Sequence, residues 1–483
     1  MLKGDDTGIS PDGFNELGVA TAAAAIRRGD ISSESYAAAL LRRARTFSGL
    51  SAFITIDETA VLAAARASDT ARAAGSTAPL LGVPVAVKDS YLTQGLRTTL
   101  GIRNLENFVP DRDAGVVRAI KDAGGIVFGK NNLVEMSCGL TGHNSHFGQA
   151  KNPHNPKHVT GGSSSGAGAS VGAQIVPAAL GGDTVGSIRV PASLCGVVGF
   201  KPSPGRWSGD GVAPISHTLD TAGVFARTVE DCALIDQVVT KAATATFHGD
   251  WADLRGIRLA YAPRQHLDRI DHEVEAHFRE TIRRLRDAGA EVLEVDLGED
   301  FFTLTERSTW GVFFHETMDS VAAFLRKNRI PSSFEDIYHE LKPGLKEAWG
   351  HLVLPSGAGF ISHETYQAAL DHDRPEIQSR FNMAFSSRRA QALIMPTTPC
   401  PAPTIEQQTK FTLAGQEVDD LALARHTVAG SIAGLPGISV PMGMSSNGLP
   451  LGLEMDGRNG DDRNLLELAR HVEAAIGLVA RPI

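Results

Sequence analysis

Three residues of this sequence could form a hydrolase site that needs no histidine. Lys88 follows the short apolar run 85–87, Ser163 lies in the segment GGSSSGAGAS, and Ser187 lies in GGDTVGSIRVPASLCG. A serine hydroxyl becomes an effective nucleophile only when a base accepts its proton. An unperturbed lysine has a pKa of about 10.4 and is charged near neutral pH, so Lys88 could serve as that base only if burial lowered its pKa.

One alternative places the nucleophile at Ser164. The residues from Gly162 to Gly166 read GxSxG, which is the nucleophile elbow of α/β-hydrolases. That elbow follows directly on a hydrophobic strand, whereas the preceding segment KNPHNPKHVT holds two prolines and polar side chains and is typical of a loop. A flexible linker is a second alternative for this Gly/Ser stretch, but the small residues that follow it predict a closely packed helix over about 166–176.

A metal-dependent hydrolase is a different class of enzyme that the sequence brings into view. Four histidines fall within sixteen positions: His143, His146, His154 and His158. Metal sites often use histidines that share one face of a helix, but Pro153 and Pro156 would break a helix there. We therefore predict no metal and no other cofactor.

The elements around the candidate residues alternate between strand and helix. An alanine-rich helix is predicted over 20–28, followed by a helix that Ser32 or Ser33 can cap. A strand over 85–88, a helix over 116–123 that Gly124 ends, and a strand over 126–128 come next. Residues 257–295 repeat strand, helix and strand, and 300–390 are mostly helical. This order predicts an α/β fold with strands buried under helices.

Composition narrows the classes of partner. The chain has 483 residues, 42% of them hydrophobic, and a net charge of −9 without a basic run, so we expect neither nucleic acid nor a membrane surface as partner. The first ten residues lack a signal peptide's basic and apolar regions, and no apolar stretch of about 18 residues occurs, so we predict a cytoplasmic protein. Four scattered cysteines are expected to be reduced, buried thiols: Cys138, Cys195, Cys232 and Cys400.

Five long motifs, taken together, resemble the amidase signature family in their order and spacing. They are LGVPVAVKD, TGGSSSGAGAS, GGDTVGSIRVPASLCGVVGFKP, MPTTPCPAP and SIAGLPGISVPMGMSSNGLPLGLEM, and the resemblance runs from about Ala20 to Gly477. It implies one amidase domain over residues 1–483, with a large mixed central β-sheet covered by helices on both faces. Within that domain, the helical segment of about 300–390 is expected to be an insertion on the substrate side.

The resemblance also assigns roles to the first three candidates. It implies that Ser187 is the nucleophile, that Ser163 is a bridging serine after a cis peptide bond, and that Lys88 is the terminal base. The physical logic agrees, because without a histidine in these motifs the proton must pass through a second hydroxyl to a neutral amine. The implied reaction is acyl transfer through a serine acyl-enzyme.

The oxyanion hole would be formed by main-chain amides of the same loop. The resemblance assigns it to Thr184, Val185 and Gly186, together with the amide of Ser187. Members of the family usually have glycine where this chain has Val185. A valine is unfavourable at positive φ, so either φ is negative at Val185 or the loop differs. Ser165 is another departure, because glycine is commoner at that position.

The acyl pocket is implied by a loop that the resemblance places beside the catalytic residues. The matching residues are Met136, Ser137, Cys138, Gly139, Leu140 and Thr141. They offer no lysine or arginine for an anionic substrate, so we predict neutral, hydrophobic carboxamides such as aryl amides and anilides. Carbamates (urethanes) and esters follow the same acyl-transfer path and are further candidates. Trp310, Phe313 and Phe314 could wall the leaving-group side, but their helical spacing favours a place in the core.

The predicted function is therefore hydrolysis of C–N bonds in small amides. The alternative is the glutamine-hydrolysing subunit of a tRNA-dependent amidotransferase, which belongs to the same family and works within a complex. The acidic charge and the lack of a basic stripe weigh against contact with RNA, although a partner could supply that surface. A non-catalytic binding protein ranks third. The expected partners are a small-molecule substrate and a second copy of the chain in a homodimer.

Overall fold

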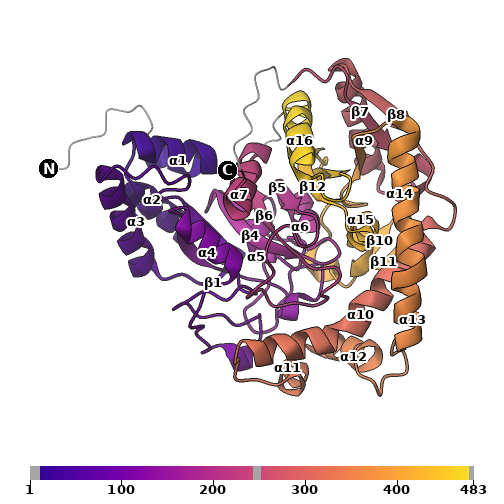
Figure 1. The fold of residues 1–483 in the computed structure, drawn as a ribbon, viewed down its shortest axis with the longest axis horizontal. Helices are drawn as coiled ribbons and strands as arrows, with labels where there is room; N and C mark the ends of the chain where they lie inside the picture. The colour runs from indigo at the N-terminus through magenta and orange to yellow at the C-terminus, as the bar shows by residue number, and fades with distance from the viewer. Residues whose placement is uncertain (1–10, 243–251, 478–483) are drawn as a thin grey trace.

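One mixed β-sheet of eleven strands runs through the molecule. The computed structural model describes residues 11–242 and 252–477, so the expectation about the first ten residues lies outside the described part (Figure 1). The strand order in the sheet is β1-β3-β2-β4-β6-β5-β12-β13-β9-β7-β8, and β10 and β11 form a separate hairpin. The neighbours β2–β3, β2–β4, β7–β8 and β7–β9 are parallel, and the other pairs are antiparallel.

The strands are short, and most of those near the centre of the sheet are fully buried. They are β1 Phe53–Thr55, β2 Pro84–Lys88, β3 Ile126–Asn131, β4 Ala178–Asp183, β5 Val198–Lys201, β6 Thr221–Ala226, β7 Arg258–Tyr261, β8 Glu291–Glu294, β9 Ala392–Pro396, β10 Lys410–Leu413, β11 Gln416–Asp419, β12 Gly437–Met444 and β13 Pro450–Asp456.

Helices cover the sheet on both faces. They are α1 Val19–Arg28, α2 Ser33–Thr46, α3 Glu58–Ala73, α4 Gly115–Asp122, α5 Ser165–Gly172, α6 Arg189–Cys195, α7 Val229–Thr240, α8 Pro263–His266, α9 His272–Asp287, α10 Phe301–Lys327, α11 Phe334–Glu340, α12 Pro343–Leu352, α13 His363–Ala368, α14 Arg374–Arg388, α15 Thr427–Ala433 and α16 Asp462–Ile476.

The core consists of two apolar clusters, which lie on opposite faces of the sheet at β9 and β7. Strand β9 shows the division, because Ala392 and Ile394 belong to one cluster while Leu393 and Met395 belong to the other. Successive side chains of a strand point to opposite faces, so a strand covered on both sides is apolar at every position. The prediction of a large mixed sheet covered by helices on both faces is confirmed.

Local predictions agree with the elements observed, with differences in length. The strand predicted over 126–128 extends to Asn131. Ser32 is the N-cap of α2 and accepts a hydrogen bond from the amide of Ser35. The helix of small residues begins at Ser165 and ends at Gly172, where the prediction extended it to about residue 176. Residues 173–177 instead form the turn between α5 and β4.

The segment that was expected to be a substrate-side insertion is helical, as predicted. Helices α10 to α14 form an arm on the side of the molecule opposite to the N-terminal helices α1 to α3 (Figure 1). Its role toward the substrate stays a prediction. Within residues 11–242 and 252–477, none of the helices combines the length and the apolar character that a membrane crossing needs.

Candidate active site

Two parallel strands bring the first parts of the site together. Lys88 is the last residue of β2, and Val87 pairs with Leu180 of the parallel strand β4. The carboxyl ends of parallel strands meet at one edge of a sheet, so the loop that follows β4 begins beside Lys88. This loop, residues 184–188, connects β4 to α6 and carries Ser187.

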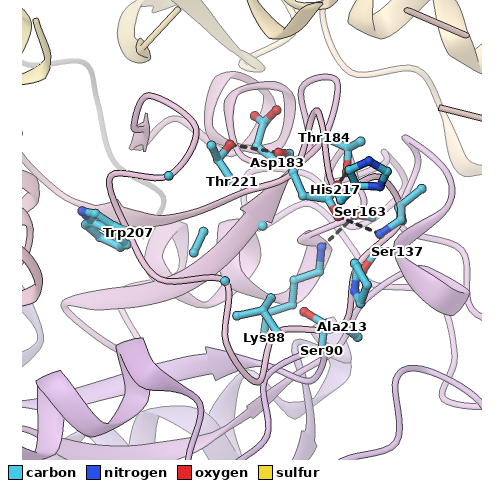
Figure 2. A pocket seen from close by; sticks show the side chains of 18 residues that line it. Lys88, Ser90, Ser137, Ser163, Asp183, Thr184, Trp207, Ala213, His217 and Thr221 are labelled. Atoms are coloured by element: carbon cyan, nitrogen blue, oxygen red, sulfur yellow. Dashed lines mark hydrogen bonds between the residues drawn. The ribbon is translucent and has the colours of Figure 1, made fainter. Parts of the chain in front are cut away.

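Lys88 and Ser163 are in direct contact. The Nζ atom of Lys88 donates a hydrogen bond of 2.8 Å to Oγ of Ser163, as the dashed line in Figure 2 shows. Both side chains are buried, with 1% of each residue exposed. The peptide bond between Gly162 and Ser163 is cis. The structure therefore brings together the two residues that the sequence proposes as base and bridge.

The electrostatic environment of Lys88 favours the neutral amine. Burial lowers the pKa of Lys88 to about 7, although the negative charges of Asp183 and Asp220 act in the opposite direction. Desolvation disfavours the charged form of any base, and within the described residues Lys88 forms no ion pair that would offset it. A large fraction of Lys88 is therefore able to accept a proton at neutral pH.

Ser187 lies in a loop that Asp183 holds from inside. The carboxylate of Asp183 accepts hydrogen bonds from the amides of Gly186, at 2.7 Å, and Ile188, at 3.0 Å. The carbonyl of Ser187 accepts a hydrogen bond of 3.3 Å from the amide of Ser164. Through these bonds the loop is tied both to its own strand and to the serine-rich segment that carries Ser163.

Arg189 in turn holds Asp183. Its guanidinium donates to both carboxylate oxygens of Asp183, each at 3.1 Å, and the two side chains are buried. Burial alone would raise the pKa of Asp183, but the charge and hydrogen bonds of Arg189 outweigh it and the pKa lies below its usual range. Asp183 is therefore a stable anion that fixes the loop geometry.

Glycine is required at one position of this loop and valine is accommodated at another. Gly186 has φ of +141°, and a Cβ atom there would overlap Oγ1 of Thr427. Val185 does not have positive φ, so its branched side chain is compatible with the backbone. The carbonyl of Val185 accepts a hydrogen bond of 2.5 Å from Thr427, and its side chain lies in an apolar cluster.

A cavity of about 240 Å³ opens in front of Lys88 and Ser163 (Figure 2). Of the residues predicted for the site, it is lined by Lys88, Ser163, Thr184 and Ser137. Val185, Gly186 and Ser187 follow Thr184 in the same loop but are not among its lining residues. The cavity therefore gives access to the base and the bridging serine and to the start of the proposed oxyanion loop.

The predicted acyl-pocket loop contributes mainly through its backbone. Met136 and Ser137 both have positive φ, of 47° and 60°, and Ser137 faces the cavity. The main chain of Gly139 lies against Gly162, where a Cβ atom would be 2.7 Å from the Gly139 carbonyl. The side chains of Met136, Cys138 and Leu140 belong to the apolar cluster that contains Leu393 and Met395. Thr141 is also buried, and its carbonyl accepts a hydrogen bond from Gln149.

Most of the remaining wall of the cavity is formed by a segment that no motif of the sequence predicted. Residues 205–222 supply lining side chains that include Trp207, Val212, Ile215, His217 and Asp220. Its sequence, which includes GDGVAPIS a few residues after the motif that ends in GFKP, carries no local signal that distinguishes a cavity wall from a surface loop.

Asp220 connects this segment to the oxyanion loop. One of its carboxylate oxygens accepts a hydrogen bond of 2.6 Å from Oγ1 of Thr184, and the other accepts from the amides of Ile215 and Ser216. Burial raises the pKa of Asp220 to about 6, although these hydrogen bonds act to lower it. Asp220 therefore fixes the position of Thr184 relative to the cavity wall formed by residues 205–222.

The geometry of Ser164 speaks against the nucleophile-elbow alternative. Its Oγ donates to the carbonyl of Gly182 at 3.0 Å and accepts from the amide of Gly182 at 3.2 Å. The side chain is buried and joins the start of α5 to the end of β4. Both hydrogen-bonding capacities of the hydroxyl are used by the backbone, as expected for a structural serine.

The four clustered histidines have separate partners. Their ring nitrogens lie against Lys342 (His143) and against the carbonyls of Glu340 (His146), Cys195 (His154) and Ala402 (His158). In the part of the chain that the structure describes, no group of three histidine, cysteine or acidic side chains is arranged to hold a metal ion. The four cysteines are buried and free.

The aromatic residues of α10 lie in the core. Trp310 stacks on Phe314 with ring centroids 5.8 Å apart, and Phe313 is edge-on to both rings. Phe313 belongs to the apolar cluster that contains Leu393 and Met395, and Trp310 and Phe314 pack against that cluster. None of the three lines the cavity in front of Lys88. The geometry thus favours the interpretation as core, which the sequence also preferred.

Comparison with known proteins shows the family of this chain. A family profile described as Amidase matches residues 35–466. The mandelamide hydrolase of Pseudomonas putida is 33% identical over 97% of this chain and 93% of that protein. One subunit of the glutamyl-tRNA(Gln) amidotransferase of Roseiflexus sp. is 36% identical over 94% of this chain and 95% of that protein.

Solved structures show the same likeness. A crystal structure titled as an amidase superimposes with a TM-score of 0.84 at 27% identity, covering 95% of this chain and all of that one. The native peptide amidase of Stenotrophomonas maltophilia superimposes with a TM-score of 0.79 at 27% identity, covering 97% and 98% of the two chains. The fold and the site thus define a hydrolase that acts on C–N bonds. The chain belongs to the amidase family, whose members carry the amidase signature.

Proposed function

We propose that this protein hydrolyses small, neutral carboxamides through an acyl-enzyme on Ser187, with Ser163 and Lys88 as proton relay. The observation that carries the proposal is the contact of 2.8 Å between the buried Lys88 and Ser163, in a setting that lowers the pKa of Lys88 to about 7. A neutral amine beside a hydroxyl can accept the proton that a serine nucleophile must lose.

The proposed first half-reaction builds and collapses a tetrahedral intermediate. Oγ of Ser187 attacks the carbonyl carbon, its proton passes to Ser163, and the proton of Ser163 passes to Nζ of Lys88. The negative charge that develops on the carbonyl oxygen is stabilised by the amides of Thr184, Val185 and Ser187. The amide of Gly186, expected from the sequence to share this role, already donates its hydrogen to Asp183 and so holds the loop in place. When the C–N bond breaks, the relay returns the proton to the leaving amine.

The second half-reaction uses the same groups. A water molecule loses a proton to the relay and attacks the acyl-enzyme, and the ester bond to Ser187 then breaks. Ser187 recovers its proton and the carboxylic acid leaves. Because carbamates and esters present the same carbonyl carbon, the proposal includes them as candidate substrates.

The cavity supports a neutral, hydrophobic acyl group. Its described lining combines Trp207, Val212 and Ile215 with small residues, and it includes no arginine. The other polar side chains of that lining include His217, Asp183 and Asp220. Lys88 is the single lysine among the described lining residues, and it must be uncharged to act as base. The name of the mandelamide hydrolase relative points the same way, because mandelamide is a neutral primary amide that carries a phenyl ring.

Hydrolysis of glutamine for an amidotransferase is the second candidate function. The observation in its favour is that relatives named as subunits of glutamyl-tRNA(Gln) amidotransferases reach 36% identity. The α-carboxylate of glutamine requires a counter-charge, however, and the described lining of the cavity offers no arginine for it. We therefore rank this function below stand-alone hydrolysis. Cytoplasmic location and a homodimer also remain proposals.

The test is a panel of one aryl acetamide, one anilide, one carbamate and glutamine, assayed with the purified single chain. We expect turnover of at least one aryl amide by the wild type and loss of about 10³-fold or more in Ser187→Ala. Ser164→Ala is the matched control and is expected to retain turnover. The proposal is wrong if Ser164→Ala abolishes activity while Ser187→Ala does not. Exclusive turnover of glutamine would favour the second candidate.

A further inference from the structure

A fully buried group of charged side chains lies behind the oxyanion loop. No more than 1% of any of these residues is exposed, and they are Asp183, Arg189, Lys201, Glu454 and Asp456. Three carboxyl groups face two cationic groups, so full ionisation would leave one negative charge buried without compensation. Such a charge is strongly unfavourable in a protein interior. One proton held by the carboxyl groups would make the cluster neutral.

The sheet brings two of the carboxyl groups to one place. Glu454 and Asp456 are alternate residues of β13 and so point to the same face. Gly437 of β12 pairs with Asp456 on one side and with Lys201 of β5 on the other. A Cβ atom at Gly437 would lie 2.8 Å from an oxygen of each carboxyl group. The missing side chain at Gly437 therefore opens the space in which the two groups meet.

Arg189 donates hydrogen bonds to two of the three carboxyl groups, those of Asp183 and Glu454, and none to Asp456. Arg189 donates from Nη1 to Glu454 Oε1 at 3.0 Å and uses Nε and Nη2 for Asp183. The carboxyl groups of Glu454 and Asp456 are neighbours, because one oxygen of each lies 2.8 Å from the same point, the Cβ position of Gly437. Among the described residues, no donor gives a hydrogen bond to either oxygen of Asp456 or to Oε2 of Glu454. Two carboxyl groups can form a hydrogen bond only if one of them carries a proton.

We propose that Glu454 and Asp456 are positioning residues that share a single proton, and that this proton keeps Arg189 on Asp183 and thereby keeps the oxyanion loop in its catalytic arrangement. The chain of contacts is continuous. Glu454 binds Arg189, Arg189 binds Asp183, and Asp183 accepts the amide hydrogens of Gly186 and Ile188.

Loss of the shared proton would weaken this arrangement. The pair would then carry two negative charges, repel itself and draw Arg189 away from Asp183. The groups that face the pair are Arg189 from α6, Asp183 from β4 and Lys201 from β5, whose charge also meets Asp462 of α16. Burial raises the pKa of Glu454 to about 8, although Arg189 acts to lower it. The oxyanion loop stabilises charge in the transition state, so kcat should fall while KM changes little.

The experiment is a pH profile of kcat, and it rests on the proposed function because it needs an amide that the enzyme hydrolyses. Between about pH 5 and pH 10, the wild type should show an alkaline decline approaching tenfold per pH unit. In Glu454→Gln and Asp456→Asn, the amide replaces the shared proton permanently, so this decline should disappear or move up by at least one pH unit.

Glu473→Gln is the matched control. Burial raises the pKa of Glu473 to about 7, but its carboxylate accepts from Val229 at the start of α7, away from the oxyanion loop. This variant should keep the alkaline decline. If the wild type shows no decline, or if the decline is the same in Glu454→Gln, Asp456→Asn and Glu473→Gln, the proposal is wrong. A decline that arises from Lys201 would give the second result, because Lys201 is unchanged in all three.

A measurement on the wild-type protein covers the case in which the variants do not fold. Difference infrared spectra should show the C=O band of a protonated carboxyl group that disappears over the pH range of the alkaline decline. Absence of that band at neutral pH would overturn the proposal. The acid side of the profile and Ser187→Ala test the proposed function separately, so failure of one hypothesis can be told from failure of the other.

Discussion

Two buried lysines on neighbouring strands lie in regions of very different character. Lys88 ends β2 and faces the cavity, and Lys130 lies in β3, where it pairs with Val87. No more than 1% of the surface of either residue is exposed. Lys130 donates to the carbonyl of Tyr91 and to Oγ1 of Thr98, and it forms an ion pair of 3.2 Å with Asp89. Lys88 donates to Ser163 and, within the described residues, has no ion pair.

The comparison shows that burial alone does not make a lysine a base. Burial lowers the pKa of both amines, but at Lys130 the adjacent carboxylate of Asp89 acts in the opposite direction. All the donors of Lys130 can be used by fixed acceptors, so its role is structural. At Lys88 the nearest acidic groups are not in contact, and the neighbour is a hydroxyl that can carry a proton.

The largest expected effect separates the two lysines by activity. Lys88→Met removes the proposed base, so we expect kcat/KM to fall by about 10³-fold or more on the best amide substrate. Lys130→Met should keep activity per folded molecule within about tenfold, because it touches no proposed reacting group. Steady-state kinetics with circular dichroism as a folding check would measure this. Equal losses in both variants would remove the distinction.

The second prediction distinguishes Lys130 from Lys88 by how much each contributes to the stability of the fold. Removing one partner of a buried ion pair leaves the other charge uncompensated, so Lys130→Met should lower the free energy of unfolding by about 3 to 5 kcal/mol. Lys88→Met breaks no ion pair and should lose far less. Urea denaturation followed by fluorescence gives both values. A more severe loss in Lys88→Met would mean that Lys88 is the structural lysine.

The third prediction concerns the acid side of the pH profile. The pKa of Lys88 is lowered to about 7, and the neutral amine is the active form, so the rate should rise with pH and reach half its plateau near pH 7. Below that pH the amine is protonated and the rate should fall by about tenfold per unit. A flat profile, measured where chemistry is the slow step, would contradict the assignment of Lys88 as base.

The smallest expected effect tests the distant charges around Lys88. Asp220→Asn removes a negative charge that favours the ammonium form, so the pKa of Lys88 should fall further. The acid side of the profile should move to lower pH by a few tenths of a unit, with about twofold more activity near pH 6. Thr184→Val removes a hydrogen bond that lowers the pKa of Asp220, so it should move the profile in the same direction by a smaller amount. A shift to higher pH in Asp220→Asn would show that its charge does not act on Lys88.

Much of the fold could be predicted because its signals are local. The cap at Ser32 and the alternation of strand and helix depend on residues close in the chain, and both are observed. The candidates Lys88, Ser163 and Ser187 could be named because they stand in long motifs. The wall formed by residues 205–222 could not, since nothing local distinguishes a loop that covers a cavity from one on the surface.

The sequence by itself determined the family, the α/β class and the residue types available for chemistry. Only the tertiary structure decided which lysine lies beside a serine and which beside a carboxylate. It also placed Glu454 and Asp456, more than 250 residues from Asp183, behind the oxyanion loop. The physical reason is that pKa values and proton sharing depend on burial and on neighbours in space. The eleven-stranded sheet brings those neighbours together from distant parts of the chain.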